Sequence, residues 1–313
     1  METEAVIIKD PGKLYLGEVA LKELGAGEVV VATQFSGVST GTERLFWNGE
    51  MPTFPGMGYP LVPGYEAVGE VVETRGSDKF RVGDFVFVPG ANCYKDVKGL
   101  FGASARLLIA SEAKLIKIDK ELKETGTLFA LAATARHAIA GLGNKMPNLI
   151  VGHGVLGRLL ARLTIAAGGE PPVVWETNPA RFSGSEGYEV LNPLEDENRN
   201  YESIYDASGD ASVLDQIIQR LQKNGEIVLA GFYSKPITFS FPPAFMREAK
   251  LRISAEFTKE DISVTKSLID TNALSLNNLI SDKRAAEESP EAYRVAFEDT
   301  NCLKMVIDWR KAA

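Results

Sequence analysis

The residues best suited to chemistry lie in one glycine-rich stretch of the 313-residue chain. Gly152, Gly154 and Gly157 have the spacing GxGxxG, and Glu176 follows 24 residues after the first glycine. In such a turn the first glycine permits a tight bend, the second lets the backbone approach a pyrophosphate, and the third allows close helix–strand packing. A carboxylate at the spacing of Glu176 reaches an adenosine ribose hydroxyl. The pattern predicts a dinucleotide site, with a structural glycine turn or an S-adenosylmethionine site as the alternatives.

The segments around the turn must position these residues. An apolar run precedes Gly152, an Ala/Leu-rich helical segment runs from the turn to Ala167, and a second apolar run ends on Glu176. This strand–helix–strand order places the N–H groups and the positive end of the helix at the phosphates. Further strands are predicted near 189–191, 203–209, 225–231 and 251–255, with a helix over 213–221. Strands that alternate with helices favour a doubly wound parallel sheet, in which ligands bind at the carboxyl ends of the strands.

Residues 1–117 have a different pattern. Short β-branched runs alternate with Gly and Pro, which predicts a compact β-barrel-like domain. A long, irregular, aromatic-rich loop interrupts it between residues 35 and 69, and its apolar side chains, among them Phe46, look exposed. We expect the loop either to line a pocket for a large flat apolar ligand or to pack on its own domain or a second subunit. The run 303–309 is predicted to be a strand that returns to this first domain. The acid-rich stretch 195–200 is predicted to be a solvated connection.

Bulk properties exclude several classes. The net charge of 34 − 42 = −8 gives no support for nucleic-acid binding. No segment approaches the roughly 18–20 apolar residues that span a bilayer, and the first residues do not read as a secretion signal. Two cysteines far apart in the sequence exclude a disulfide scaffold and a four-cysteine zinc lobe. A cytoplasmic enzyme is the expectation.

Several motifs occur in the order that is typical of one superfamily. They are VPGYEAVGEV (62–71), VGDFV (82–86), AATA (132–135), the glycine turn, and YDASG (205–209). The chain resembles the medium-chain dehydrogenases/reductases. That resemblance implies an α/β protein with a GroES-like β-barrel domain, residues 1–117 plus 273–313, and a Rossmann domain, residues 118–272.

Longer runs, among them VFVPGANCY and FPPAFMREA, are similar to the bacteriochlorophyllide dehydrogenases of bacteriochlorophyll synthesis. This narrower resemblance implies a secondary-alcohol dehydrogenase. It would oxidise the 3-(1-hydroxyethyl) group of bacteriochlorophyllide a, or of the chlorophyllide analogue, to 3-acetyl with NAD. The alternatives are a quinone or enone reductase and a non-catalytic NAD(H)-binding module. The partner implied is a bacteriochlorophyllide-type tetrapyrrole, and the sequence leaves room for a homodimer.

Zinc members of the superfamily carry a cysteine and a histidine where this chain has Ser39 and Tyr65. Both are poor zinc ligands at neutral pH, so we predict no metal. Without zinc, side chains must take the hydroxyl proton. The catalytic candidates are Tyr65 to orient the hydroxyl, Ser39 and Thr42 as a relay, and Glu66 as a base. Glu66 has the alternative of a structural acid paired with an arginine, Tyr65 has the alternative of packing, and Ser39 and Thr42 have the alternative of turn capping.

For the cofactor, Glu176 favours NAD because a carboxylate repels a 2′-phosphate, whereas Arg181 could pair with one. We expect the His153 side chain to point elsewhere or to lie near a phosphate, and His137 to pack. The predicted cofactor residues are Thr134, Gly152, His153, Gly154, Val155, Leu156, Gly157, Glu176, Asn178, Arg181, Ser208, Gly209, Gly231 and Phe232. The predicted substrate residues are Trp47, Phe54, Tyr59, Phe245 and Arg247, the last to pair with a propionate, and a structural role is the alternative for the segment around Phe245.

Overall fold

The computed structural model describes residues 1–141 and 143–310, and the chain divides into two compact units. Unit 1 contains residues 1–130 and 279–310, and unit 2 contains residues 131–278. The sequence placed the two divisions after residues 117 and 272, and the structure places them after residues 130 and 278. Leu142 and residues 311–313, which fall within the predicted domains, lie outside the described residues.

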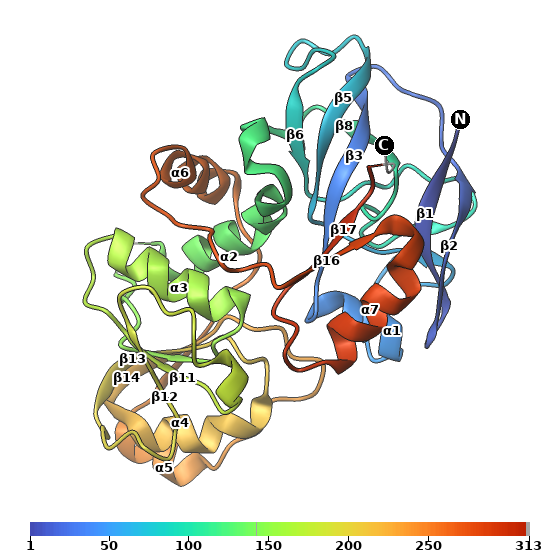
Figure 1. The fold of residues 1–313 in the computed structure, drawn as a ribbon. Coiled ribbons are helices and arrows are strands. Elements are labelled where there is room, and N and C mark those ends of the chain that lie inside the picture. Colours follow the sequence, from blue (N-terminus) through green and yellow to red (C-terminus); the bar gives the residue numbers. More distant parts are fainter. Residues whose placement is uncertain (142, 311–313) are drawn as a thin grey trace. The chain divides into compact units, whose positions relative to one another are not determined.

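The larger sheet of unit 1 is built around a long central strand, β3 (Glu28–Val38). β5 (Ala67–Arg75) pairs with β3 antiparallel, and Ser36 faces Ala67 in the register. The sheet order is β16 (Asp282–Ala285), β17 (Met305–Asp308), β3, β5, β6 (Phe85–Val88) and β9 (Ile116–Lys117), and β8 (Leu107–Ser111) pairs with β3 off this path. β17 lies antiparallel to β3 in this sheet (Figure 1), which confirms the predicted return of the final strand.

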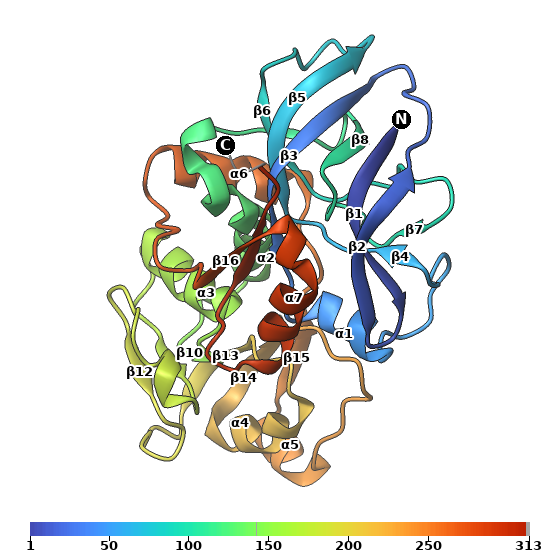
Figure 2. The ribbon, with the colours of Figure 1, turned by 45° about the vertical axis from the view of Figure 1, so that its right-hand side comes forward.

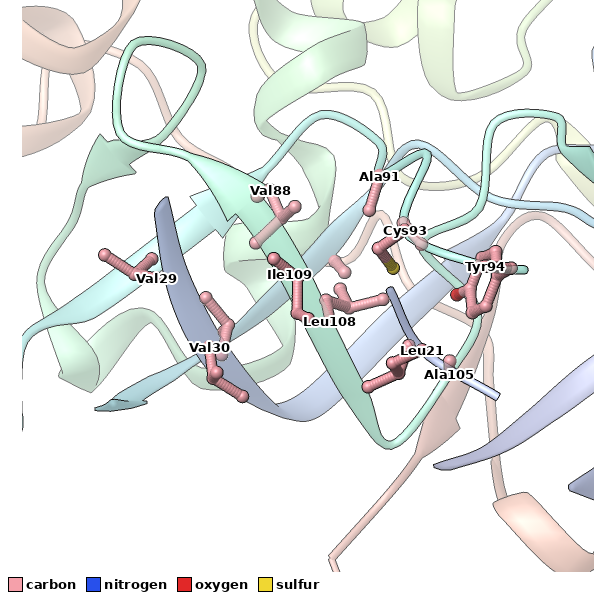
Figure 3. Packing of buried hydrophobic residues seen from close by; sticks show 14 of the residues in the cluster. Leu21, Val29, Val30, Val88, Ala91, Cys93, Tyr94, Ala105, Leu108 and Ile109 are labelled. Carbon is pink, nitrogen blue, oxygen red and sulfur yellow. The ribbon is translucent and has the colours of Figure 1, made fainter. Parts of the chain in front are cut away.

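A second sheet in unit 1 has the order β2 (Lys13–Ala20), β1 (Glu2–Asp10), β4 (Leu61–Val62) and β7 (Lys98–Gly99). Apolar side chains from both sheets and from the loops between them form one buried cluster. Figure 3 shows part of it, with Leu21, Val29, Val30, Val88, Cys93 and Leu108 packed together. Burial of these β-branched and leucine side chains holds the unit together, because the apolar area removed from water is the main favourable term in folding.

The aromatic-rich loop is more ordered than the sequence predicted. It contains α1 (Thr42–Asn48), and the ring of Phe46 is fully buried rather than exposed. The C-terminal segment adds the 3-10 turn Ala286–Glu288 and α7 (Ser289–Glu298), which packs beside β2 while α1 packs beside β1 (Figure 2). Trp47 meets Phe297 of α7 with ring centroids 6.3 Å apart. Much of the loop therefore packs on its own unit.

Unit 2 contains a parallel sheet, as predicted. Its strand order is β12 (Glu189–Leu191), β11 (Val173–Trp175), β10 (Leu149–Val151), β13 (Tyr201–Asp206), β14 (Leu221–Leu229) and β15 (Lys250–Ile253). Leu149 and Val151 of β10 pack with Leu214 and Ile217, which lie on one face of the sheet. Ile150 points to the other face and is also buried, because successive side chains of a strand alternate.

Helices cover both faces of this sheet. Figure 1 shows α3 (Val155–Ala166) on one face, and α4 (Leu214–Arg220) and α5 (Phe241–Arg247) on the other. The remaining helices are the 3-10 helix Lys120–Leu128, which runs into α2 (Phe129–Ile139), the short 3-10 turns Pro179–Arg181 and Ala211–Val213, and α6 (Lys259–Asp270).

The prediction that residues 195–200 are a solvated connection is wrong at Asp196. Its carboxylate is buried and accepts hydrogen bonds from Trp175 Nε1 and Tyr201 Oη, both at 2.7 Å. The acid-rich composition of the segment hid this, because a buried carboxylate is recognisable only once its donors, here from β11 and β13, are known.

Candidate active site

The glycine turn has the geometry that a phosphate site requires. Gly152 follows β10 with φ +97°, a conformation that favours glycine. Gly154 is the N-cap of α3. Apart from its chain neighbours, no atom of the described residues lies within 4 Å of the place where its Cβ would be. A Cβ on Gly157 would clash with the carbonyl oxygen of Gly152, so the helix begins directly against the strand. The backbone is open at Gly154, and Val155 and Leu156 form the first turn of α3 behind it.

Glu176 is held beside this turn by backbone groups. Its Oε1 accepts hydrogen bonds from the backbone N–H of Thr177 at 2.7 Å and of Asn178 at 2.8 Å. Its Oε2 accepts one from the backbone N–H of His153 at 3.2 Å. The carboxylate is therefore fixed between the glycine turn and the segment that follows β11. Asn178 caps the 3-10 turn there by accepting from the backbone N–H of Ala180 at 3.1 Å.

The other predicted cofactor residues of the sheet gather at its carboxyl edge. Ser208 and Gly209 follow β13, and Gly231 and Phe232 follow β14. A Cβ on Gly152 would lie 3.2 Å from the backbone nitrogen of Ser208, so these turns adjoin. Thr134 lies on α2 and is partly buried. The structure therefore brings the glycine turn, Glu176 and the Ser208 turn together.

Sequence reasoning missed Asp206, the last residue of β13. Its Oδ1 accepts hydrogen bonds from the backbone N–H and the hydroxyl of Ser208, at 2.8 and 2.6 Å. Its Oδ2 accepts one from the hydroxyl of Tyr233. One carboxylate thus ties together the turns after β13 and β14. Asp206 could have been predicted from the sequence, because it directly precedes the turn that carries Ser208.

Unit 1 contains the residues predicted to handle the proton. Ser39, directly after β3, and Tyr65 share a hydrogen bond of 2.7 Å between their hydroxyl oxygens. The backbone N–H of Thr42 donates to Ser39 Oγ at 3.3 Å. The Tyr65 ring stands edge-on to Phe101, with centroids 6.0 Å apart. Burial, and then the nearby charge of Glu66, raise the pKa of Tyr65 above its ordinary value, so the phenol keeps its proton at neutral pH.

Glu66 forms an ion pair that is buried on both sides. The Lys304 ammonium contacts Glu66 Oε2, and the side-chain exposures are 2% for Lys304 and 0% for Glu66. The partner is a lysine, whereas the structural alternative predicted an arginine. A buried carboxylate persists when a cation offsets its charge. The Oε2 atom of Glu66 is therefore engaged by Lys304.

Glu43 is a second buried acid that sequence reasoning missed. It lies on α1, and its Oε1 accepts a hydrogen bond from the backbone N–H of Ser39 at 3.1 Å. Burial raises its pKa to about 8; the Ser39 N–H lowers the pKa, and the charge of Glu66 raises it further. Glu43 is therefore a neutral acid at pH 7. The signal was available, since Glu43 directly follows Thr42, which the sequence had already indicated as a catalytic candidate.

The predicted substrate residues separate into two groups. In unit 1, Trp47 packs against Phe297, Tyr59 Oη donates to the carbonyl of Phe46 at 2.5 Å, and Phe54 is 36% exposed. In unit 2, Phe245 and Arg247 lie on α5, and the Arg247 guanidinium donates to the carbonyls of Leu221 and Gln219. Arg247 precedes β15, so it lies at the amino end of the sheet, opposite the glycine turn. The structure does not bring Phe245 and Arg247 to the nucleotide edge.

His137 lies on α2, and its Nδ1 lies 2.7 Å from Asp261 Oδ2. Among the described residues, no group of three or more His, Cys, Asp or Glu side chains is arranged to hold a metal ion. Within the same residues, no helix combines the length and the apolar character needed to cross a membrane.

Residues 25–120 match the alcohol dehydrogenase GroES-like domain. The chain is 57% identical to the 2-desacetyl-2-hydroxyethyl bacteriochlorophyllide A dehydrogenase of Cereibacter sphaeroides, and 55% identical to that of Rhodobacter capsulatus, over 100% of both chains in each case. The crystal structure of 2R,3R-butanediol dehydrogenase from Bacillus subtilis has a TM-score of 0.83 at 19% identity, covering 98% of this chain and 100% of that one.

The GroES-like unit and the Rossmann-type sheet confirm the predicted fold class. The full-length relatives, both named dehydrogenases, show that the chain is an alcohol-type dehydrogenase of the medium-chain class. Within that class, the chain belongs to the family of the 2-desacetyl-2-hydroxyethyl bacteriochlorophyllide A dehydrogenases, because its identity to two of them exceeds half of all positions over their full length.

Proposed function

We propose that this protein oxidises the 3-(1-hydroxyethyl) group of bacteriochlorophyllide a, or of the chlorophyllide analogue, to a 3-acetyl group, with NAD as the hydride acceptor and without zinc. The single observation that carries the substrate is the 57% full-length identity to a dehydrogenase named for it. The reaction removes a hydride from carbon and a proton from the hydroxyl oxygen. The two halves need different residues.

The nucleotide half lies in unit 2. A bound nicotinamide dinucleotide supplies a ring that accepts a hydride. The open backbone at Gly154 and the N-terminus of α3 would hold its phosphates, and Ser208, Gly209, Gly231 and Phe232 would line its other end. Glu176 supports NAD over NADP because its fixed carboxylate accepts from a free 2′-hydroxyl and repels a 2′-phosphate.

The proton half lies in unit 1. Tyr65 keeps its own proton, so its phenol orients the substrate hydroxyl by accepting its hydrogen bond while donating to Ser39. The substrate hydroxyl would pass its proton to Tyr65 as Tyr65 passes its own to Ser39 and Ser39 passes its own to solvent water. Both side chains then end protonated, and the hydride goes to the nicotinamide ring. The 2.7 Å contact between these two hydroxyls occupies the positions at which zinc relatives carry ligands, and this supports chemistry without a metal.

The decisive experiment is turnover of the hydroxyethyl bacteriochlorophyllide with NAD, followed by NADH absorbance, together with metal analysis of the purified protein. We expect NADH formation without stoichiometric zinc. Tyr65→Phe and Ser39→Ala should lower kcat by about 10²–10⁴-fold, the usual contribution of a positioned proton-transfer group. Tyr94→Phe is the matched control, since it removes a buried hydroxyl of the same unit that donates to the Gly102 carbonyl.

The outcomes separate the alternatives. Stoichiometric zinc would contradict the metal-free proposal. Reduction of an enone or quinone with NADPH, and no alcohol oxidation, would indicate a reductase. Nucleotide binding without turnover of either substrate would indicate a non-catalytic module.

We also propose that the protein forms a homodimer through β15. This strand lies at the edge of the unit 2 sheet, and its Ile253 side chain is 68% exposed. Phe241, Phe245 and Met246 of α5 are also exposed beside it. An unpaired edge strand with apolar neighbours is a template for pairing with an identical strand about a two-fold axis. A cytoplasmic location stays a prediction.

A further inference from the structure

The imidazole of His153 contacts the chain segment that follows Glu176, residues 177–188, with both of its nitrogens. Nδ1 lies 2.6 Å from the carbonyl oxygen of Arg181, and Nε2 lies 2.9 Å from the hydroxyl of Tyr188. A carbonyl only accepts, so Nδ1 carries the hydrogen, and in the neutral ring Nε2 accepts from the Tyr188 hydroxyl. The ring is completely buried, and it fixes one tautomer with both nitrogens satisfied.

Arg158 binds the same segment from the first turns of α3. Its Nε donates to the carbonyl of His153 at 3.1 Å, and its Nη2 donates to the carbonyls of Arg181 at 3.2 Å and Ser183 at 2.9 Å. Gly184 has φ +85°, and a Cβ there would clash with the Arg158 guanidinium. The Arg181 carbonyl therefore receives two donors, one from each of two buried side chains.

His153 and Arg158 together hold residues 181–188 by these hydrogen bonds, and we call the two side chains the clamp. The clamp keeps its hydrogen bonds at physiological pH. Burial, with a further contribution from the Arg158 charge, lowers the pKa of His153 to about 4. A protonated ring would place two buried cations against each other. The charged groups that face the ring are Arg158 on α3, Arg162 further along the same helix, and Glu176 at the end of β11.

Glu176 depends on the clamped segment. Two of the three donors to its carboxylate come from Thr177 and Asn178, at the start of the segment, and the third comes from the backbone of His153 itself. If the segment moved away from the glycine turn, the three backbone donors would no longer hold the Glu176 carboxylate in one place, and the space beside the carboxylate would open.

We propose that His153 and Arg158 are positioning residues that set the preference for NAD over NADP, by holding residues 177–188 against the glycine turn so that the Glu176 carboxylate stays where a 2′-phosphate would have to enter. This proposal rests on the proposed use of NAD. It assigns neither residue a contact with the nucleotide through its side chain.

The test compares NAD and NADP binding to the full-length protein by isothermal titration, with steady-state kinetics on the hydroxyethyl substrate. His153→Phe keeps a ring but removes both hydrogen bonds, and Arg158→Met keeps the apolar stem. Each should weaken NAD binding about tenfold, as expected when one or two hydrogen bonds are lost. The NADP affinity should change less than about twofold, so the NAD-to-NADP ratio falls. The KM for NAD should rise while kcat at saturating NAD stays within about twofold.

A rescue variant and a control distinguish positioning from loss of folding. His153→Asn places an amide donor close to the position of Nδ1 and should restore most of the ratio, whereas His153→Gln should not. Arg220→Met removes another buried arginine of unit 2 that donates to backbone carbonyls, those of Pro193, Asp196 and Asn198, and should leave the ratio unchanged.

The wild-type arm tests the proposed function separately. Tighter binding of NAD than of NADP by the wild type upholds the proposed cofactor, and an unchanged ratio in both His153→Phe and Arg158→Met then overturns the clamp alone. A wild type that binds NADP as tightly as NAD overturns both proposals. An equal loss of affinity for NAD and NADP in the two variants also overturns the clamp as a specificity device.

Discussion

Glu43→Gln should stabilise the protein at alkaline pH, although the substitution removes a side chain next to the proposed proton pathway. In the native state the Glu43 carboxyl keeps its proton up to a pKa of about 8, whereas in the unfolded chain it releases the proton near the ordinary value of 4.5. Between these values the native state binds one more proton than the unfolded state. Raising the pH through this window therefore favours unfolding.

The magnitude follows from the width of the window. At about 1.4 kcal/mol per pH unit, the interval from 4.5 to about 8 corresponds to about 5 kcal/mol. The cost is absent below pH 4.5 and complete above pH 8. Glutamine has nearly the same shape and keeps an oxygen for the Ser39 N–H, but it cannot ionise, so the variant should escape this cost.

Urea unfolding of both proteins at pH 5, 7 and 8.5 tests this, with tryptophan fluorescence as the signal, to which Trp47 and Trp309 of unit 1 contribute. The free energy of unfolding of the variant, minus that of the wild type, should rise with pH by several kcal/mol. The subtraction cancels the other titrating groups. A difference that stays within about 0.5 kcal/mol from pH 5 to 8.5 would refute the buried-acid reasoning.

Two further predictions concern unit 1 and the proposed dimer. Lys304→Met leaves the Glu66 carboxylate buried without its cation and should cost about 3–5 kcal/mol in the free energy of unfolding. The double variant with Glu66→Gln should recover most of that loss, and additive costs in urea unfolding would show that the pair is not coupled. Ile253→Lys should convert the homodimer into a monomer, so light scattering should give twice the chain mass of 34.0 kDa for the wild type and 34.0 kDa for the variant. A wild-type mass of 34.0 kDa would contradict the dimer.

The sequence predicted the glycine turn and the parallel sheet around it because their signals are local. The GxGxxG turn, its flanking strands and Glu176 lie within about thirty residues, and each residue type follows from a backbone requirement that holds wherever the turn occurs. The parallel sheet and the return of β17 followed from short apolar runs in the same way.

The surroundings of the proposed proton-transfer residues were harder to predict because the partners are distant in the sequence. Lys304 reaches Glu66 across 238 positions, and no local pattern announces that a lysine will be buried. Phe46 looked exposed because it lies among glycines and prolines, and only the packing of α1 shows that it is buried. Arg247 was predicted to bind the substrate because it is a cation among apolar residues. In the structure its guanidinium donates hydrogen bonds to backbone carbonyls at the end of α4.

The position of β17 in the sheet has a consequence for the order in which the chain folds during synthesis. Unit 2 is one continuous segment, residues 131–278, and all of its strands leave the ribosome before β17 does. Residue 308 follows residue 130 by 178 positions, which at roughly 5–20 residues per second is a delay of about 9–36 s. Throughout that interval the edge of β3 at residues 35–38 lacks its final partner. Unit 2, whose residues lie between the two segments of unit 1, can therefore complete its core first. The barrel of unit 1 is completed only after the last strand has been synthesised.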